Sequence, residues 1–198
     1  MANDGNTVDL WHLDGTTSSA GKLNGENGND LTDGSSAPTA TTGIIVPTTD
    51  GAAVYSGGAN SYHTLGDLAS MPTGDFTWEF WVNFTGTAAD TEGVITKYGT
   101  VGTRSFFIQR DPDNKITWGV SLLGTVFVNV TSATALTSGT WYYIACVFTA
   151  GTTIETFINA VSDASNSTSI PAAVLDGTSA IDFGNYQAFR TDAGTAYN

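Results

Sequence analysis

Carboxylates and aromatic rings are the residue types in this chain that could carry chemistry, and the segment 75–84, DFTWEFWVNF, contains both. Asp75 and Glu79 lie on the same side of that segment if it is extended. A glycosidase needs two carboxyl groups about 5–5.5 Å apart to retain the configuration of the sugar, or about 6.5–9.5 Å apart to invert it. Four residues of an extended strand span about 13 Å, which is too far for either reaction. We therefore expect no catalytic residues here and disfavour a glycoside hydrolase.

Trp81 is the residue of this segment that best fits a ligand-binding role. Its large apolar neighbours alternate with polar residues, which is typical of a strand with one buried face. These neighbours are Phe76, Trp78, Phe80, Val82 and Phe84. Trp81 falls on the polar face beside Glu79 and Asn83, and an aromatic ring flanked by polar groups can hold a sugar. The alternative is that Trp81 packs beneath a covering loop or a second sheet. Tyr186 and Phe189 are further candidate platforms.

A group of acidic and amide residues near the N-terminus could bind a metal ion. Ca²⁺ takes several oxygen ligands, and this chain has 19 Asp and Glu against six Lys and Arg. Asn27, Asn29 and Asp30 cluster in the stretch GENGND, with Asp14 upstream. The stretch does not match an EF-hand loop, which is longer and ends in Glu. The alternative is that Asn, Gly and Asp gather there because turns favour them. Ca²⁺ is the cofactor that the sequence suggests.

Other common catalytic patterns are absent from the sequence. His12 and His63 lie in no short motif with a Ser, a Cys or a second His, and both have the surroundings of ordinary strand residues near a sheet rim. The sequence contains no zinc motif, serine-hydrolase elbow or phosphate loop. Cys146 is the only cysteine and lies in an apolar segment, so we expect a buried and unreactive thiol.

Composition narrows the class of protein further. A chain of 198 residues that is 40% hydrophobic can form one large β domain, and no linker divides it. The formal net charge of −13 would repel phosphate backbones, which argues against nucleic acid as a partner. No apolar run approaches the roughly 20 residues that span a bilayer, and no signal peptide opens the sequence. We expect an extracellular or virion-surface location, reached after removal of a signal or as part of a virus particle.

The apolar runs predict many short strands and no helix. Eleven strands are expected, with turn residues between them. They are Val8–Leu13, Ala52–Ser56, Tyr62–Leu65, Asp75–Phe84, Val94–Tyr98, Ser105–Arg110, Lys115–Ser121, Thr125–Val130, Trp141–Phe148, Thr153–Ala160 and Ala180–Phe183. This number of strands favours an all-β fold, a two-sheet antiparallel sandwich. The stretch 31–49 is irregular and is expected to be a long surface loop.

Two of these segments carry more specific expectations. Residues 141–148 are apolar on both faces, so this strand should be central in its sheet and covered on each side. Asp111-Pro112-Asp113-Asn114 has Pro where a type I turn favours it, which predicts a hairpin between 105 and 121.

The order of several short motifs resembles the LamG-like, concanavalin A-like jelly-roll family over nearly the whole chain. The motifs are residues 10–14 (LWHLD), 25–30 (GENGND), 53–57 (AVYSG), 62–65 (YHTL), 74–82 (GDFTWEFWV), 95–99 (ITKYG) and 138–145 (SGTWYYIA). The resemblance implies a single LamG-like domain over residues 1–198, with two stacked antiparallel sheets. It also implies a glycan or protein ligand on a concave face or rim loops, and often a calcium ion at one rim near residues 26–30. The Glu-x-Asp-x-x-Glu pattern of the related glucanases is absent.

Two departures from the family pattern lead to further expectations. Asn159-Ala160 stands where the family usually has Asp-Gly, so we expect a turn of another type there. The family's closing strand, which would pair beside the N-terminal strand, is missing because the sequence stops at Asn198. A truncated sequence is the simplest explanation; if the terminus is native, the first strand would have an unpaired edge to which a partner chain could add a strand.

Three functions follow from these observations, in order of preference. The first is a non-catalytic module that binds a glycan or a surface protein, displayed on an extracellular or particle-bound protein. The second is a structural or decoration subunit of a virion or an extracellular assembly. The third is a glycoside hydrolase, which the carboxylate spacing disfavours.

Overall fold

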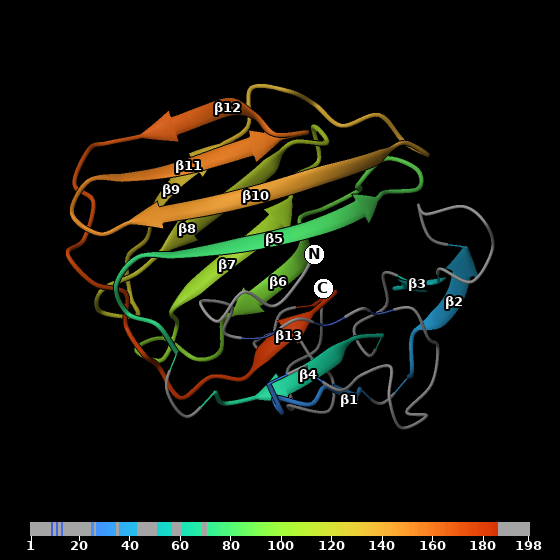
Figure 1. Ribbon diagram of the computed structural model, residues 1–198, viewed down its shortest axis with the longest axis horizontal. Helices are drawn as coiled ribbons and strands as arrows, with labels where there is room; N and C mark the ends of the chain where they lie inside the picture. Colours follow the sequence, from blue (N-terminus) through green and yellow to red (C-terminus); the bar gives the residue numbers. More distant parts are fainter. Residues whose placement is uncertain are drawn as a thin grey trace.

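A computed structural model describes residues 9, 11, 13, 25, 27–34, 36–42, 51–56, 61–68 and 71–185. These residues form a β-sandwich and no helix, which confirms the predicted fold class (Figure 1). No helix in the described part of the chain is long and apolar enough to cross a membrane.

The larger sheet has seven strands, and every pairing within it is antiparallel. In spatial order its strands are β1 (Thr32–Asp33), β4 (His63–Gly66), β13 (Ile181–Phe183), β6 (Glu92–Lys97), β7 (Phe106–Arg110), β8 (Ile116–Val120) and β9 (Val128–Thr131). The strands β6 to β9 are neighbours in both sequence and space, so this half of the sheet is a meander of hairpins.

The second sheet has four antiparallel strands and lies over the larger sheet (Figure 1). In spatial order its strands are β12 (Val161–Asn166), β11 (Thr153–Ile158), β10 (Trp141–Thr149) and β5 (Phe76–Asn83). A separate two-stranded sheet pairs β2 (Thr39–Thr42) with β3 (Gly51–Val54).

All predicted strands from residue 52 onward have a counterpart in the structure, and three observed strands were not predicted. β1 and β2 lie within the stretch 31–49, where a surface loop was expected, and Leu31 is buried at 4% exposure. β12 was missed because it is a polar edge strand whose pairing depends on backbone hydrogen bonds rather than on an alternating pattern. Of the strand predicted at 8–13, only Asp9, Trp11 and Leu13 are described, and none of these three is in a strand.

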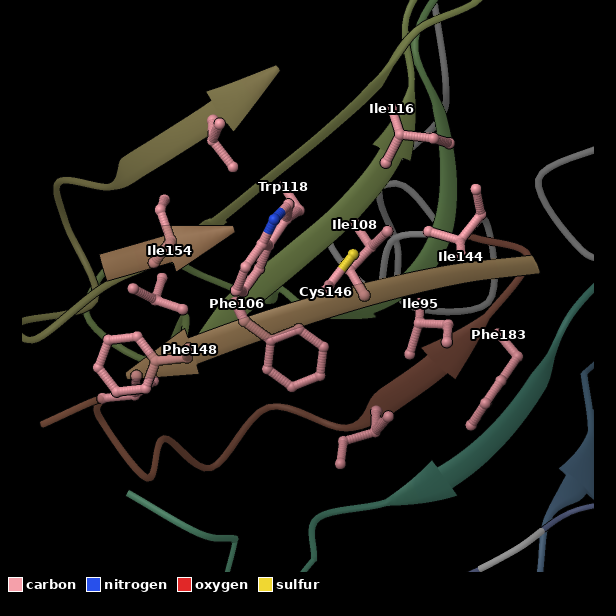
Figure 2. Packing of buried hydrophobic residues seen from close by; sticks show 14 of the residues in the cluster. Ile95, Phe106, Ile108, Ile116, Trp118, Ile144, Cys146, Phe148, Ile154 and Phe183 are labelled. Carbon is pink, nitrogen blue, oxygen red and sulfur yellow. The ribbon is translucent and has the colours of Figure 1, made fainter. Parts of the chain in front are cut away.

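The core fills the space between the two sheets with aliphatic and aromatic side chains (Figure 2). Trp118 of β8 is fully buried, and its indole N–H donates a hydrogen bond of 3.1 Å to the hydroxyl of Thr156 on β11. This contact links the two sheets and satisfies the only polar atom of the indole. Cys146 is also fully buried, as predicted, and burial raises the pKa of its thiol.

β10 is the central strand that its apolar sequence predicted, but only one of its faces is closed. It lies between β11 and β5, and Ile144 and Phe148 point into the core with 0% and 1% exposure. On the other face Tyr143 and Val147 are only half-buried. The expectation that this strand is covered on each side was therefore wrong. Its outward residues shield one another sideways, and in the described part of the chain no further sheet packs on them.

Two turns, one in each sheet, show how local sequence determines the hairpins. The predicted hairpin between 105 and 121 is confirmed, because the N–H of Asn114 donates to the Asp111 carbonyl at 2.8 Å between β7 and β8. The β11–β12 turn contradicts the expectation of another type. Asn159 and Ala160 have φ values of 52° and 64°, the left-handed pair that a two-residue type I′ hairpin requires. The strand twist imposes this turn even though Ala160 is not glycine.

One edge of the sandwich is held closed by polar side chains. Asp163 of β12 accepts hydrogen bonds from the N–H groups of Ala133 and Thr134, at 2.6 and 3.1 Å, just after β9. It also accepts a hydrogen bond from the Thr134 hydroxyl. The Asn166 amide donates to the carbonyl of Asn129 at 2.9 Å. Edge strands β9 and β12, which belong to different sheets, are thereby tied to each other.

Candidate ligand-binding face

The period-two pattern of β5 turns a row of side chains away from the core. Trp78 packs against the core, whereas Glu79 and Trp81 are exposed on the opposite face. Trp81 is 48% exposed, although a side chain of its size is usually mostly covered. The alternative that a loop or a second sheet covers Trp81 does not hold, because the larger sheet packs on the other face of β5.

Pairing with β10 supplies a second aromatic ring beside Trp81. The register places Tyr143 directly opposite Trp81, and their ring centroids lie 5.4 Å apart at an interplanar angle of 48°. Aromatic pairs at this separation attract each other beyond the area that they bury. Ala145, the next outward residue of β10, lies opposite Glu79 and is buried among its neighbours. The outward face of β5 and β10 therefore carries two adjacent rings.

A hydrogen bond between Glu79 and Tyr143 orders the polar part of this face. Partial burial, this hydrogen bond and the negative charge of Glu79 together raise the pKa of Tyr143 to about 12. The phenol is therefore protonated at neutral pH and donates to the carboxylate. A carboxylate has room for about four hydrogen bonds, so Glu79 keeps acceptor positions that a sugar hydroxyl could fill.

The face continues over β11 and β12. Phe157 lies opposite Ala145, and Glu155 lies opposite Val147, so both are on the same side of the sheet as Tyr143. The hydroxyl of Ser162 donates to a Glu155 carboxylate oxygen at 2.6 Å. We call the outward side chains of Glu79, Trp81, Tyr143, Glu155 and Phe157 the outer face. It combines aromatic rings with acceptor oxygens, as in a surface that binds a hydroxylated ligand.

Asn83, also predicted to bind a ligand, is partly buried at the end of β5. It lies opposite Trp141 at the end of β5, and its carboxamide oxygen is buried and makes no hydrogen bond within the described residues. Tyr186 and Phe189 lie outside the described residues.

The two carboxylates first considered for hydrolysis have separate roles. Asp75 accepts a hydrogen bond of 2.8 Å from the N–H of Ala150, so it braces the turn between β10 and β11. Glu79 is bonded to Tyr143 on the outer face. The structure does not bring these two carboxylates together.

The predicted calcium residues are organised by a carboxylate instead of by an oxygen cage. The N–H groups of Asn27 and Asn29 each donate to Asp9 at 3.0 Å, and the Asn29 side-chain amide donates to it at 2.8 Å. Asp30 is exposed, and Asp14 lies outside the described residues. Because Ca²⁺ needs several oxygens that converge on one point, these contacts account for the turn without a cation. No group of three or more His, Cys, Asp or Glu suited to a metal occurs in the described part of the chain.

His63 has a structural environment. It is fully buried on β4, with its Nδ1 2.9 Å from the hydroxyl of Tyr55 and its Nε2 3.3 Å from a carboxylate oxygen of Asp33. Burial lowers the pKa of His63, although the charge of Asp33 acts in the opposite direction. His63 is thus a core residue and not the rim residue that its sequence suggested. His12 is outside the described residues.

Tyr143 is the important residue of the outer face that sequence reasoning missed. It belongs to the run WYYIACVF, where both faces are apolar and no alternation marks the outward positions. The register with β5 would have identified it, because that register pairs the inward Ile144 with Phe80 and therefore turns Tyr143 outward.

Comparison with known proteins gives a family and a set of similar folds. A family model described as the concanavalin A-like lectin/glucanases superfamily matches residues 56–195. No match was found among curated proteins. Among solved structures, the binding domain of Paraclostridial Mosquitocidal Protein 1 superposes with a TM-score of 0.66 at 14% identity, over 80% of this chain and 40% of that one.

Two further similar structures are binding domains of botulinum neurotoxins. The serotype G domain has a TM-score of 0.62 at 14% identity and covers 85% of this chain and 42% of its own. The neurotoxin DC domain, solved in complex with SialylT, has a TM-score of 0.55 at 8% identity and covers 87% and 43%. The chain thus spans about two fifths of each of these proteins, and the likeness is one of fold.

Proposed function

Because the chain belongs to the concanavalin A-like lectin/glucanase superfamily, we propose that it is a non-catalytic binding module that holds a carbohydrate on the outer face of its four-stranded sheet. The observation that carries this proposal is Trp81, which is 48% exposed on the sheet and lies against Tyr143. Similar folds that are described as binding domains agree with a binding role.

The two parts of the outer face would have distinct roles toward a sugar. The ring of Trp81 would stack on the C–H face of a pyranose, where its apolar area is removed from water. Glu79 would accept hydrogen bonds from sugar hydroxyls while Tyr143 holds the carboxylate in place. This division favours a neutral sugar with hydroxyl donors, because a carboxylate on the ligand would be repelled by Glu79 and by the net charge of −13.

A glycan array probed with the purified protein tests the proposal. The wild type is expected to bind a limited set of neutral glycans, and Trp81→Ala and Glu79→Gln should each weaken binding to that set. Val161→Ser on β12 is a matched control, because Val161 is 67% exposed and lies opposite the inward Ile158, on the other side of the sheet from the outer face. Failure of the wild type to bind any glycan would contradict the proposal, as would equal binding by the Trp81 variant.

Running the array in millimolar calcium and again in EDTA addresses the metal prediction. Loss of binding in EDTA would support a role for Ca²⁺, and mutation of Asp14 or Asp30 should then reproduce it. Binding that persists in EDTA would support carbohydrate binding and contradict a role for Ca²⁺ in it. The extracellular or virion-surface location, and the alternative role as a subunit of an assembly, stay predictions from the sequence; light scattering after size exclusion would reveal an ordered oligomer in the second case.

A further inference from the structure

The end of the sandwich formed by the β6–β7 and β8–β9 loops exposes several aliphatic side chains. In an antiparallel meander these two loops lie at the same end of the sheet (Figure 1, left). Val101 is 65% exposed, Leu122 48%, Leu123 70% and Val126 77%. We call these four residues the apolar tip. They are four of the seven large hydrophobic residues that are exposed in the described part of the chain, and such a concentration marks an interaction site rather than ordinary surface.

Hydrogen bonds hold the apolar tip in place. The N–H of Gly102 in the first loop donates to the carbonyl of Gly124 in the second at 2.9 Å. The Ser121 hydroxyl donates to the Val126 carbonyl at 2.7 Å and accepts from the N–H of Gly124 at 2.9 Å. The segment before β13 adds a third support, because the N–H of Leu175 donates to the Ser121 carbonyl at 2.8 Å. These contacts fix the two loops to each other and to the segment before β13.

A belt of aromatic rings lies behind the apolar tip. Tyr98 and Phe127 stack with centroids 5.4 Å apart, and Phe107 meets both rings edge-on. The Arg104 guanidinium lies 4.2 Å above the Tyr98 ring and donates to the Gly99 carbonyl. This arrangement matches the layers of a bilayer. Aliphatic side chains at the tip suit the acyl region, and a Tyr and a basic group behind them suit the headgroup region.

Charge also separates this end from the rest of the molecule. The segments 98–105, 121–127 and 174–179 contain one cation, Arg104, and one anion, Asp176, although the chain as a whole carries −13. An anionic membrane would repel such a protein, whereas a zwitterionic surface would not. A protein partner fits the composition less well, because protein contacts depend mainly on Trp, Tyr and Arg, with Leu and Val under-represented.

From the exposed side chains, their fixed backbone and the local charge, we infer that the apolar tip inserts into the surface of a zwitterionic lipid bilayer. The insertion is shallow, because the apolar tip consists of four side chains on two loops. It is independent of the proposed carbohydrate site on the outer face.

Vesicles of pure phosphatidylcholine, which carry no glycan, provide the test. The wild type and the control Val161→Ser are expected to float with the vesicles. Leu123→Ser/Val126→Ser should bind at least about tenfold more weakly, because two apolar side chains no longer leave water. Both positions are exposed, so the double variant should keep the thermal midpoint of the wild type. Phosphatidylserine at low ionic strength should weaken binding.

A second variant reports insertion directly. Leu123→Trp should show a blue-shifted emission on addition of vesicles and should be quenched by lipids brominated near the headgroup end of the acyl chain. The inference is overturned if the wild type does not bind phosphatidylcholine, if the double variant binds as well as the wild type, or if the new Trp stays in water. An oligomer that the double variant abolishes, without vesicle binding, would assign the tip to a second copy of the chain instead. Unchanged glycan binding by the double variant separates this test from that of the proposed function.

Discussion

Replacing Ala160 by glycine should stabilise the protein, although no contact is gained. Ala160 occupies the second central position of the β11–β12 turn at φ 64°, where its Cβ crowds the carbonyl oxygen. Relief of a left-handed conformation is worth about 1–2 kcal/mol for an L-residue. Glycine adds about 0.5–1 kcal/mol of conformational entropy to the unfolded chain, which opposes the gain. The net effect is an increase of about 0.5–1 kcal/mol in the free energy of unfolding.

Gly151 provides the matched reverse substitution. It lies in the β10–β11 turn at the other end of β11, at φ 67°, and an added Cβ would meet nothing within 4 Å. Gly151→Ala therefore changes only the conformational free energy of the backbone, and it should lower the free energy of unfolding by a similar amount. Urea unfolding followed by tryptophan fluorescence measures both variants, with a constant m-value as the sign that the folded and unfolded states are unchanged. Shifts of the same sign, or no effect of Ala160→Gly, would refute the reasoning.

Three further substitutions probe groups that the structure buries or pairs. Tyr143 should titrate near pH 12 when phenolate absorbance is followed. The contribution of its protonated phenol to the free energy of unfolding is complete below pH 10 and is lost as the pH rises toward 12, and Tyr143→Phe should remove this transition. Burial lowers the pKa of His63 despite Asp33, so the free energy of unfolding should fall as the pH drops below about 6.5, and His63→Gln should flatten that dependence in urea titrations from pH 7 to pH 5. Thr156→Val leaves the buried N–H of Trp118 without an acceptor and should cost about 1–3 kcal/mol; a loss of the same size in the Trp118→Phe background would show that the hydrogen bond is not the cause.

Alternation of apolar and polar residues was sufficient to predict the strands that line the core. β5 was predicted to within one residue at each end because five large side chains alternate along it and one face of the strand must be buried. The same alternation identified Trp81 as an outward ring. A pattern of this kind reports burial, so it succeeds wherever burial determines the structure.

The elements that escaped prediction depend on contacts between distant residues. β12 contains VSDASN, whose polar residues carry no periodic signal, and it is held by pairing with β11 and by the contacts of Asp163. Tyr143 faces outward because of its register with Trp81, which a single segment does not reveal. The turn at 27–30 is organised by Asp9, about 20 residues upstream, and nothing in the local motif predicts that partner.

The order of the strands has a consequence for how the chain folds. β6 to β9, and β10 to β12, each pair with the strand next in sequence, so their turns close short loops of chain. Between β4 and β13 the hydrogen bond from the Thr64 hydroxyl to the Ile181 carbonyl spans 117 residues. Such a contact can form only after most of the chain has been synthesised, and the entropy cost of closing so long a loop makes its formation slow. We expect the two meanders to form first and the β4–β13 seam to form last, so that during synthesis the edge of β6 that faces β4 stays unpaired until β13 arrives.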